Sequence, residues 1–294
     1  MNALEFDRLL WPQTPAKSTA NNVFVLETAH GYLRYLDTQK DNRPSLVFLC
    51  DPPVQVESYQ PLIELLGASY RLIAVELPGY GQSKIKSGKA MAFRDTTEQL
   101  AMLLNTLRLK QYVLIAPCVT CFVAVSLVKN HGLKPASLIL MQAPSLQEMR
   151  AWTDRMDPKK LLRTPYLGQL LMRIKAKGLA RFWMHYASGS KQAGSKLAAE
   201  VSRGMDAGAS YPLASMLQSW YRSGPADGSL EIPTLSIWGR RDRSHAETPC
   251  GCTAAHSSDM VHLEMHNTGH FSELEDPEQF VRLVAPFLHR HLSG

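Results

Sequence analysis

The sequence lacks the hallmarks of a membrane-spanning or secreted chain. Nowhere in its 294 residues does an uninterrupted apolar run approach the roughly 18 residues that a transmembrane helix needs. Residues 1–13 carry Glu5, Asp7 and Arg8 and do not follow the basic-then-apolar order of a signal peptide. We therefore expect a cytoplasmic protein without a membrane span.

Cysteine is scarce, and its count is odd. The five thiols are those of Cys50, Cys118, Cys121, Cys250 and Cys252. Without a secretory signal, an odd count argues against a disulfide framework. The Cys-x-x-Cys spacing of Cys118 and Cys121 leaves a thioredoxin-like redox site open as an alternative. Cys250 and Cys252 are spaced more tightly than a usual structural zinc pair, so we predict no metal and no cofactor.

Positive charge is concentrated in one part of the chain. The formal net charge is +6, yet residues 146–230 hold 13 Lys and Arg against 6 Asp and Glu, which leaves 19 basic and 20 acidic residues elsewhere. A basic segment on a neutral body indicates either an anionic partner or a solvated helix surface. Nucleic acid is not expected, because no recognised binding motif or interleaved aromatic pattern accompanies the charge.

Short apolar runs alternate with helical patterns through most of the chain. Two alternating segments on either side of Ala29-His30-Gly31 predict a β-hairpin over residues 23–36. Short apolar runs predict buried strands at residues 46–49, 72–75, 112–116, 138–141, 235–238 and 261–265. Helical apolar spacing predicts helices at residues 59–66, 93–109 and 119–131. Strands buried on both faces that alternate with helices predict an α/β fold with a mostly parallel sheet flanked by helices.

The alternation stops between Ala143 and Ile232. This stretch has helical apolar spacing, is basic and is rich in Met, Trp and Tyr. It predicts a helical cap inserted into an α/β core. We therefore divide the chain into an N-terminal core part at residues 1–144, a cap at residues 145–231 and a C-terminal core part at residues 232–294.

One turn between a predicted strand and a predicted helix carries a cysteine with small neighbours. In Ala116-Pro117-Cys118-Val119-Thr120, Cys118 takes the serine position of Gly-x-Ser-x-Gly, and Ala116 and Thr120 take the glycine positions. A nucleophile on such a turn needs small residues two positions away, because the strained backbone brings them close. Taken alone, the pentapeptide is more typical of a buried structural cysteine.

Three further segments support a catalytic interpretation of this turn. Residues 76–83 (Glu-Leu-Pro-Gly-Tyr-Gly-Gln-Ser) resemble the Asp-x-Pro-Gly-x-Gly-x-Ser turn of α/β-hydrolases, with Glu in place of Asp. Residues 237–242, which end in Asp242, resemble the acid turn of that family, and Asn267-Thr268-Gly269-His270-Phe271 resembles its histidine loop. Nucleophile, acid and histidine follow in the order of this fold. These matches to α/β-hydrolases cover the chain from about Ser45 onward, and the cap resembles that of capped carboxylesterases and carbon–carbon bond hydrolases.

The resemblance implies a Cys-His-Asp catalytic triad. Cys118 would be the nucleophile, His270 the base that takes its proton, and Asp242 the residue that orients His270. A thiol at a helix N-terminus beside a histidine is expected to rest as a thiolate–imidazolium pair. Cys121 is expected to pack inward from the helix, and Cys50 to lie near Cys118.

The oxyanion hole departs from the family pattern. The N–H of Val119 is expected to be one donor. The second donor normally comes from a His-Gly-x-Pro turn, which here reads Cys50-Asp51-Pro52-Pro53. Pro52 falls at the donor position and has no N–H, so Val54 is the alternative. A missing donor costs on the order of 3–4 kcal/mol of transition-state stabilisation.

Two functions of different classes follow from these features. The first is attack of a thiolate on an ester or thioester, followed by passage of the acyl group to water (a thioesterase) or to another nucleophile (an acyltransferase). Dienelactone hydrolases and polyester synthases also place a cysteine at this turn. An acyl group on CoA or on an acyl carrier protein would suit the basic, apolar cap. The second function is that of a catalytically impaired binding or accessory protein on the same fold.

Overall fold

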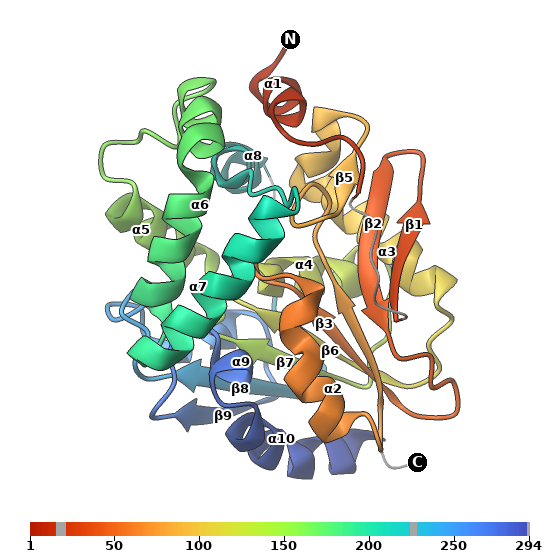
Figure 1. The fold of residues 1–294 in the computed structure, drawn as a ribbon. Helices are drawn as coiled ribbons and strands as arrows, with labels where there is room; N and C mark the ends of the chain where they lie inside the picture. Colours follow the sequence, from red (N-terminus) through yellow and green to blue (C-terminus); the bar gives the residue numbers. More distant parts are fainter. Residues whose placement is uncertain (16–21, 224–227, 293–294) are drawn as a thin grey trace.

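The strands form one largely parallel sheet. The computed structural model describes residues 1–15, 22–223 and 228–292. Within them the sheet has nine strands in the order β1-β2-β4-β3-β6-β7-β8-β9, with β5 paired to β2 (Figure 1). β1 (Val23–Glu27) and β2 (Gly31–Asp37) form the predicted antiparallel hairpin. β2 is antiparallel to β4, and all neighbours from β4 to β9 are parallel, which confirms the predicted fold class.

The parallel strands coincide with the predicted apolar runs. They are β3 (Ser45–Leu49), β4 (Arg71–Val75), β6 (Tyr112–Pro117), β7 (Ser137–Met141), β8 (Thr234–Gly239) and β9 (Met260–Met265), while β5 (Lys84–Ile85) is short. Every residue of the parallel strands β3, β4, β6, β7 and β8 is buried, as expected for strands covered on both faces of the sheet. β9 is partly exposed because it forms the edge of the sheet.

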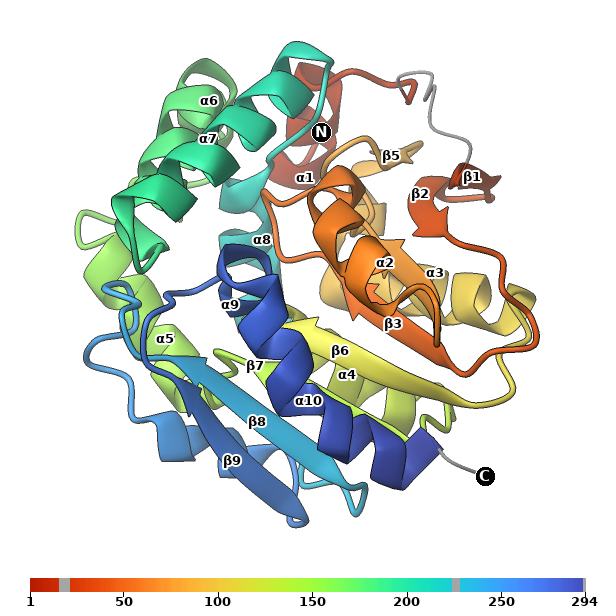
Figure 2. The same ribbon diagram turned by 60° about the horizontal axis from the view of Figure 1, so that its bottom comes forward.

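Helices cover both faces of this sheet (Figure 2). α2 (Gln60–Leu66) and α10 (Pro277–Leu292) lie on one face, and α3 (Phe93–Thr106) and α4 (Thr120–Lys129) on the other. Eight residues of α4 are buried, which anchors the turn that precedes it. Short helical segments occupy the loops: η1 (Val56–Tyr59), η2 (Gly88–Met91), η3 (Cys250–Ala255) and α9 (Ser272–Glu275).

A helical insert separates β7 from β8, as predicted. It contains α5 (Leu146–Met156), α6 (Leu167–Ala187), α7 (Lys191–Asp206) and α8 (Leu213–Ser223), and α6 and α7 lie side by side (Figure 1). The insert covers the carboxyl ends of the strands, since its Trp152 and Trp183 line one cavity together with Cys118. Among the described residues, no helix is long and apolar enough to cross a bilayer. The domain boundaries themselves stay a prediction.

The N-terminal segment forms a helix that the sequence patterns do not indicate. α1 (Ala3–Leu10) follows Asn2, whose side chain accepts a hydrogen bond from the Glu5 N–H at 2.9 Å. Asp7 is buried and accepts a hydrogen bond from the Trp11 indole at 2.8 Å. α1 packs against α6 and α8 of the insert. Residues 16–21, which follow it, lie outside the described residues.

Candidate active site

Cys118 lies on a sharp turn between β6 and α4. Its φ is +45°, in the left-handed region that non-glycine residues seldom adopt, and its N–H donates to the Met141 carbonyl at 2.7 Å. Ala116 and Thr120, two positions away on either side, are fully buried. The thiol itself lines a cavity. This is the backbone geometry of a nucleophile on a strand-to-helix turn.

The predicted histidine and acid lie beside this turn. His270, in the loop after β9, is fully buried, and its Nδ1 is 2.7 Å from Oδ2 of Asp242 in the loop after β8. A ring nitrogen of His270 lies within 4.8 Å of the Cys118 sulfur. The structure thus brings the three residues together at the carboxyl ends of parallel strands, where sites of this fold class form.

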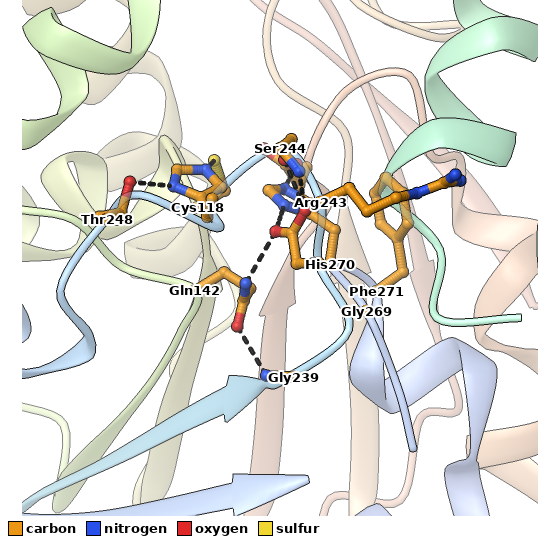
Figure 3. Close-up of polar contacts among 12 residues, drawn as sticks. Cys118, Gln142, Gly239, Arg243, Ser244, Thr248, Gly269, His270 and Phe271 are labelled. Carbon is orange, nitrogen blue, oxygen red and sulfur yellow. Dashed lines mark hydrogen bonds and ion pairs between the residues drawn. The ribbon is translucent and has the colours of Figure 1, made fainter. Parts of the chain in front are cut away.

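Asp242 is held by four hydrogen bonds. Besides His270, Gln142 Nε2 donates to its Oδ2 at 2.7 Å, and Ser244 donates its N–H and hydroxyl to Oδ1 at 2.8 and 2.6 Å. Gln142 in turn accepts the Gly239 N–H at 2.6 Å (Figure 3). Burial alone would raise the pKa of Asp242, but the charge and hydrogen bond of His270 outweigh it and lower that pKa well below its usual range. Asp242 is therefore a carboxylate oriented toward His270.

A second carboxyl group contacts the other nitrogen of His270. Oδ2 of the buried Asp51 lies 3.2 Å from His270 Nε2. Burial opposes a charge on His270, but the charge of Asp242 and the hydrogen bonds with Asp242 and Asp51 raise the pKa of the imidazole well above its usual value. Burial also raises the pKa of Asp51. His270 therefore rests as an imidazolium between two carboxyl groups.

The sequence analysis missed Asp51, although a signal was present. The residue follows β3 closely, and polar residues at the carboxyl ends of parallel strands face the site of such sheets. The family pattern gives this turn only an oxyanion donor, so it assigns the Asp51 carboxylate no role.

The resting thiolate–imidazolium pair expected from the sequence is not favoured here. Burial raises the pKa of Cys118 to about 11, the negative charge of Asp51 adds to the rise, and His270 opposes it. The imidazolium already has Asp51 and Asp242 as counter-ions. The thiol therefore stays protonated near neutral pH.

Alkylation of Cys118 is accordingly expected to depend steeply on pH. Iodoacetamide reacts with the thiolate, so its rate should rise about tenfold per pH unit until the pKa near 11. Asp51→Asn removes a negative charge beside the thiol and should shift the rise to lower pH. Asp41→Asn, at an exposed carboxylate that pairs with Arg71, should not shift it. Mass spectrometry of the peptide that contains Cys118 gives the rate, and a flat profile between about pH 6 and 9 contradicts a neutral thiol.

His245 is a second histidine at the thiol, and no sequence pattern indicates it. Its Nε2 lies 4.0 Å from the Cys118 sulfur, and its Nδ1 lies 3.1 Å from the Thr248 hydroxyl. The ring stacks on His270 and on Trp152, with centroids 5.3 and 5.7 Å apart. Burial lowers the pKa of His245 to about 3. The ring is thus neutral and covers one side of the sulfur without adding charge.

Two groups of side chains in the described residues could hold a metal ion, each with its ligand atoms within 4.8 Å of one another: Cys118, His245 and His270 in the site, and Cys250, His262 and Glu264 elsewhere. In the first group, a metal would have to displace the thiol proton and the proton between His270 and Asp51. Neither group contains Cys121, whose sulfur lies 3.6 Å from His256 Nε2 in the core.

Among the described residues, the other four cysteines form no disulfide. Cys121 is fully buried on α4, so it packs inward as predicted. Cys50 is also fully buried. The cavity above Cys118 is lined by neither of them, so the Cys-x-x-Cys spacing does not present two thiols to that cavity.

The three residues considered as oxyanion donors differ in whether they have an available backbone N–H. Among the described residues, no acceptor binds the Val119 N–H, and Val119 lines the cavity. Pro52 also lines the cavity but has no N–H to donate. The Val54 N–H donates to the Asp51 carbonyl at 2.9 Å, so Val54 is not a free donor, contrary to the alternative drawn from the sequence. Of these three residues, only Val119 offers a backbone donor.

A largely apolar cavity of about 160 Å³ lies over the thiol. Its wall combines core residues with side chains of the insert, which include Met149, Trp152, Trp183, Tyr211, Met216 and Leu217. Tyr211 is buried, and burial together with the charges of Asp51 and Cys118 raises its pKa. Its hydroxyl therefore stays protonated and can donate a hydrogen bond.

Comparison with known proteins bears on the family. A family model described as the alpha/beta hydrolase fold matches residues 54–277. A search of curated proteins found no match.

Similar solved structures include three enzymes, each 14% identical to this chain. An N-acyl homoserine lactone degrading enzyme has a TM-score of 0.70, with 90% of this chain and 100% of that chain covered. The Bacillus megaterium epoxide hydrolase has a TM-score of 0.67, with coverage of 90% and 99%. An esterase from Exiguobacterium antarcticum has a TM-score of 0.66, with coverage of 94% and 99%. At this identity, the likeness shows a shared fold.

Proposed function

The chain belongs to the α/β-hydrolase fold family, and from that premise we propose that it cleaves a small ester or thioester through an acyl-cysteine at Cys118. One observation carries the proposal. The Cys118 thiol is on a left-handed strand-to-helix turn, faces an apolar cavity and lies within 4.8 Å of a nitrogen of His270. The acyl group then passes to water or to a second nucleophile, so the activity is that of a thioesterase or an acyltransferase.

The cavity favours a short acyl group. A cavity of about 150 Å³ in a protein core holds one benzene molecule, and the cavity here has about 160 Å³. Its walls are mainly apolar, so the acyl part should be a benzoyl group or a chain of similar size. The similar structures named as an esterase and as a lactone-degrading enzyme support chemistry at an ester carbonyl.

The acylation step uses the proton that lies between His270 and Asp51. This proton passes from His270 Nε2 to Asp51 Oδ2, and the freed nitrogen takes the thiol proton as sulfur attacks the carbonyl carbon. A carbon–sulfur bond forms, and the π electrons of the carbonyl move to its oxygen. When that oxygen re-forms the double bond, the bond to the leaving group breaks and His270 protonates the leaving group. Asp51 then returns its proton to His270.

Deacylation repeats these roles with a different nucleophile. Asp51 again takes the Nε2 proton of His270, and the freed nitrogen takes a proton from water or from another acceptor as that acceptor attacks the acyl-cysteine. His270 then gives this proton to the departing sulfur, and Asp51 returns its own proton to His270. The developing oxyanion has the Val119 N–H as one donor. Because Pro52 cannot donate, we assign the second donation to the hydroxyl of Tyr211, which lines the same cavity.

The carrier of the acyl group follows from the charge of the insert. The cavity has room for the acyl part alone, so the rest of a thioester must lie outside it, against a surface rich in Lys and Arg. CoA and acyl carrier protein are both anionic carriers that fit this surface. A lower KM for benzoyl-CoA than for the benzoyl thioester of N-acetylcysteamine would identify an anionic carrier.

Intact-protein mass spectrometry with benzoyl and butyryl thioesters tests the proposed function. We expect an acyl adduct at Cys118, absent in Cys118→Ala, present in Cys250→Ala, and formed about 10²- to 10⁴-fold more slowly in His270→Ala. Cys250 is a suitable control because it is partly exposed and lies outside the cavity. Adducts on another thiol, or none with either ester or thioester, contradict the proposal.

A second candidate function is supported by the same region. The neutral thiol, the buried Asp51 and the occupied Val54 N–H are all unfavourable for fast acyl transfer. These features suit a hydrolase-fold protein that binds a small apolar ligand without turnover. Saturable binding of benzoate or benzamide, measured by calorimetry, together with no turnover of any ester or thioester, would favour this second function.

A further inference from the structure

The outer surface of the insert carries an unusual concentration of exposed apolar side chains. Of thirteen large hydrophobic residues exposed in the described structure, seven fall within residues 161–182. They are Leu161, Tyr166, Leu167, Leu170, Ile174, Leu179 and Phe182, and Ile174 and Phe182 are 64% and 58% exposed. Contiguous exposed apolar surface on a folded protein marks a place of contact with another apolar phase.

α6 presents an apolar face on each side. Met172, Ala176, Ala180 and Met184, spaced four residues apart, are buried against the rest of the protein. Leu167, Leu170 and Ile174 are exposed on the side of α6 that faces away from these four, and the exposed Phe182 stands at the margin of this row, where it also lines the cavity. These four residues belong to the inner, packed face of the helix. The outer row, which we call the apolar ridge, has no role in that packing.

Cations flank the apolar ridge, and no acid interrupts it. Residues 158–199 hold nine Lys and Arg and no Asp or Glu. Arg173, Lys175, Lys177 and Arg181 are all exposed on α6. Among the described residues, Lys177 pairs with Asp206, while Lys175 and Arg181 have no ion-pair partner. The exposed surface of α6 is therefore strongly cationic around its apolar residues.

We propose that the apolar ridge and its flanking cations dock the protein on the surface of an anionic phospholipid bilayer. Leu170, Ile174 and Phe182 would enter the boundary between head groups and acyl chains, while Lys175 and Arg181 contact lipid phosphates. A helix with a row of large apolar side chains between cations is the pattern of interfacial binding. The ridge is convex, so it suits a deformable surface better than a preformed protein groove.

The site of docking adjoins the entrance to the catalytic cavity. Leu179 and Phe182 belong to the exposed apolar group and also line the cavity over Cys118. On the proposed function, a small apolar ester dissolved in the membrane would pass from lipid to Cys118 without crossing water. Docking itself does not depend on that function, because the ridge residues Leu170 and Ile174 lie outside the cavity.

Co-sedimentation with lipid vesicles tests the docking surface. The full chain should bind vesicles of phosphatidylglycerol and phosphatidylcholine, bind pure phosphatidylcholine weakly, and dissociate as salt concentration rises. The double substitution Leu170→Glu with Ile174→Glu should weaken binding by about tenfold or more. Lys175→Glu with Arg181→Glu should do the same. Val25→Glu and Val261→Glu, at exposed apolar positions on β1 and β9, are matched controls that should bind as before.

The outcomes separate docking from catalysis and from protein binding. Adduct formation at Cys118 with a water-soluble thioester should be unchanged in the Leu170 and Ile174 variant, which also shows that it folds. Equal vesicle binding by all variants, or no binding by the wild type, overturns the docking proposal. A third outcome would favour a protein partner. If the wild type binds an acidic acyl carrier protein but no vesicles, and the α6 substitutions abolish that binding, the docking proposal is overturned.

Discussion

Asp242→Asn should lower kcat for thioester hydrolysis by about 10⁴-fold, with little change in KM. In the wild type, the Asp242 carboxylate accepts the Nδ1 proton of His270 at 2.7 Å, which leaves Nε2 free to exchange protons with Asp51 and Cys118. An asparagine amide turned toward Nδ1 donates instead of accepting. The imidazole then carries its proton on Nε2 and has no lone pair for the thiol.

The same substitution also disturbs the support of this residue. Oδ1 accepts two hydrogen bonds from Ser244, and Oδ2 accepts one from Gln142, so an amide N–H₂ group faces a donor on either side. Thermal unfolding must therefore be measured alongside kinetics. Asp259→Asn, at an exposed position after η3, is the matched control and should leave both unchanged. If Asp242→Asn is folded and retains kcat within about tenfold of the wild type, Asp242 is not the residue that orients the base.

Strand β7 illustrates why most of the core could be predicted from the sequence. The apolar run at residues 138–141 lies between a helix pattern and a polar loop, and the strand observed is Ser137–Met141. A strand buried on both faces is apolar along its whole length, so the composition of the run itself is enough to predict the strand. α1 is the opposite case. Its eight residues are too few to form a stable helix alone, and it is held by packing against α6 and α8, which are distant in sequence.

The site residues also differ in whether local sequence or tertiary packing places them. Cys118, Asp242 and His270 could be predicted because each belongs to a turn whose backbone conformation restricts the local sequence. Tyr211 and His245 could not, because they reach the thiol only through the packing of the insert and of the loop after β8.

The protonation state of the Cys118 thiol could not be predicted from the position of His270 alone. A nearby histidine indicates a thiolate only when the imidazolium lacks other counter-ions. Here Asp51 contacts Nε2 of His270 and Asp242 contacts Nδ1, so both ring nitrogens already have a carboxylate partner. The balance of burial and charge around Cys118 therefore follows from the three-dimensional arrangement and from no single motif.

Tyr211→Phe should lower kcat by about 10²- to 10³-fold if its hydroxyl replaces the missing backbone donor. Pro52 has no N–H, and the N–H of Val54 is already bonded to the Asp51 carbonyl. Val119 then supplies one donor, and Tyr211 lines the same cavity as Cys118. Loss of a donor that acts mainly on the oxyanion should reduce kcat and kcat/KM together and leave KM nearly constant.

The control for this substitution is Tyr186→Phe, which removes a hydroxyl from another tyrosine of the insert outside the cavity. Equal kinetics for both variants would contradict a role of Tyr211 in stabilising charge. A rise in KM with kcat unchanged would instead place the hydroxyl in ground-state binding. Iodoacetamide labelling separates the steps further, because alkylation at Cys118 forms no oxyanion. Tyr211→Phe should therefore label at the wild-type rate while it acylates slowly, and only a donor used during attack on a carbonyl predicts that combination.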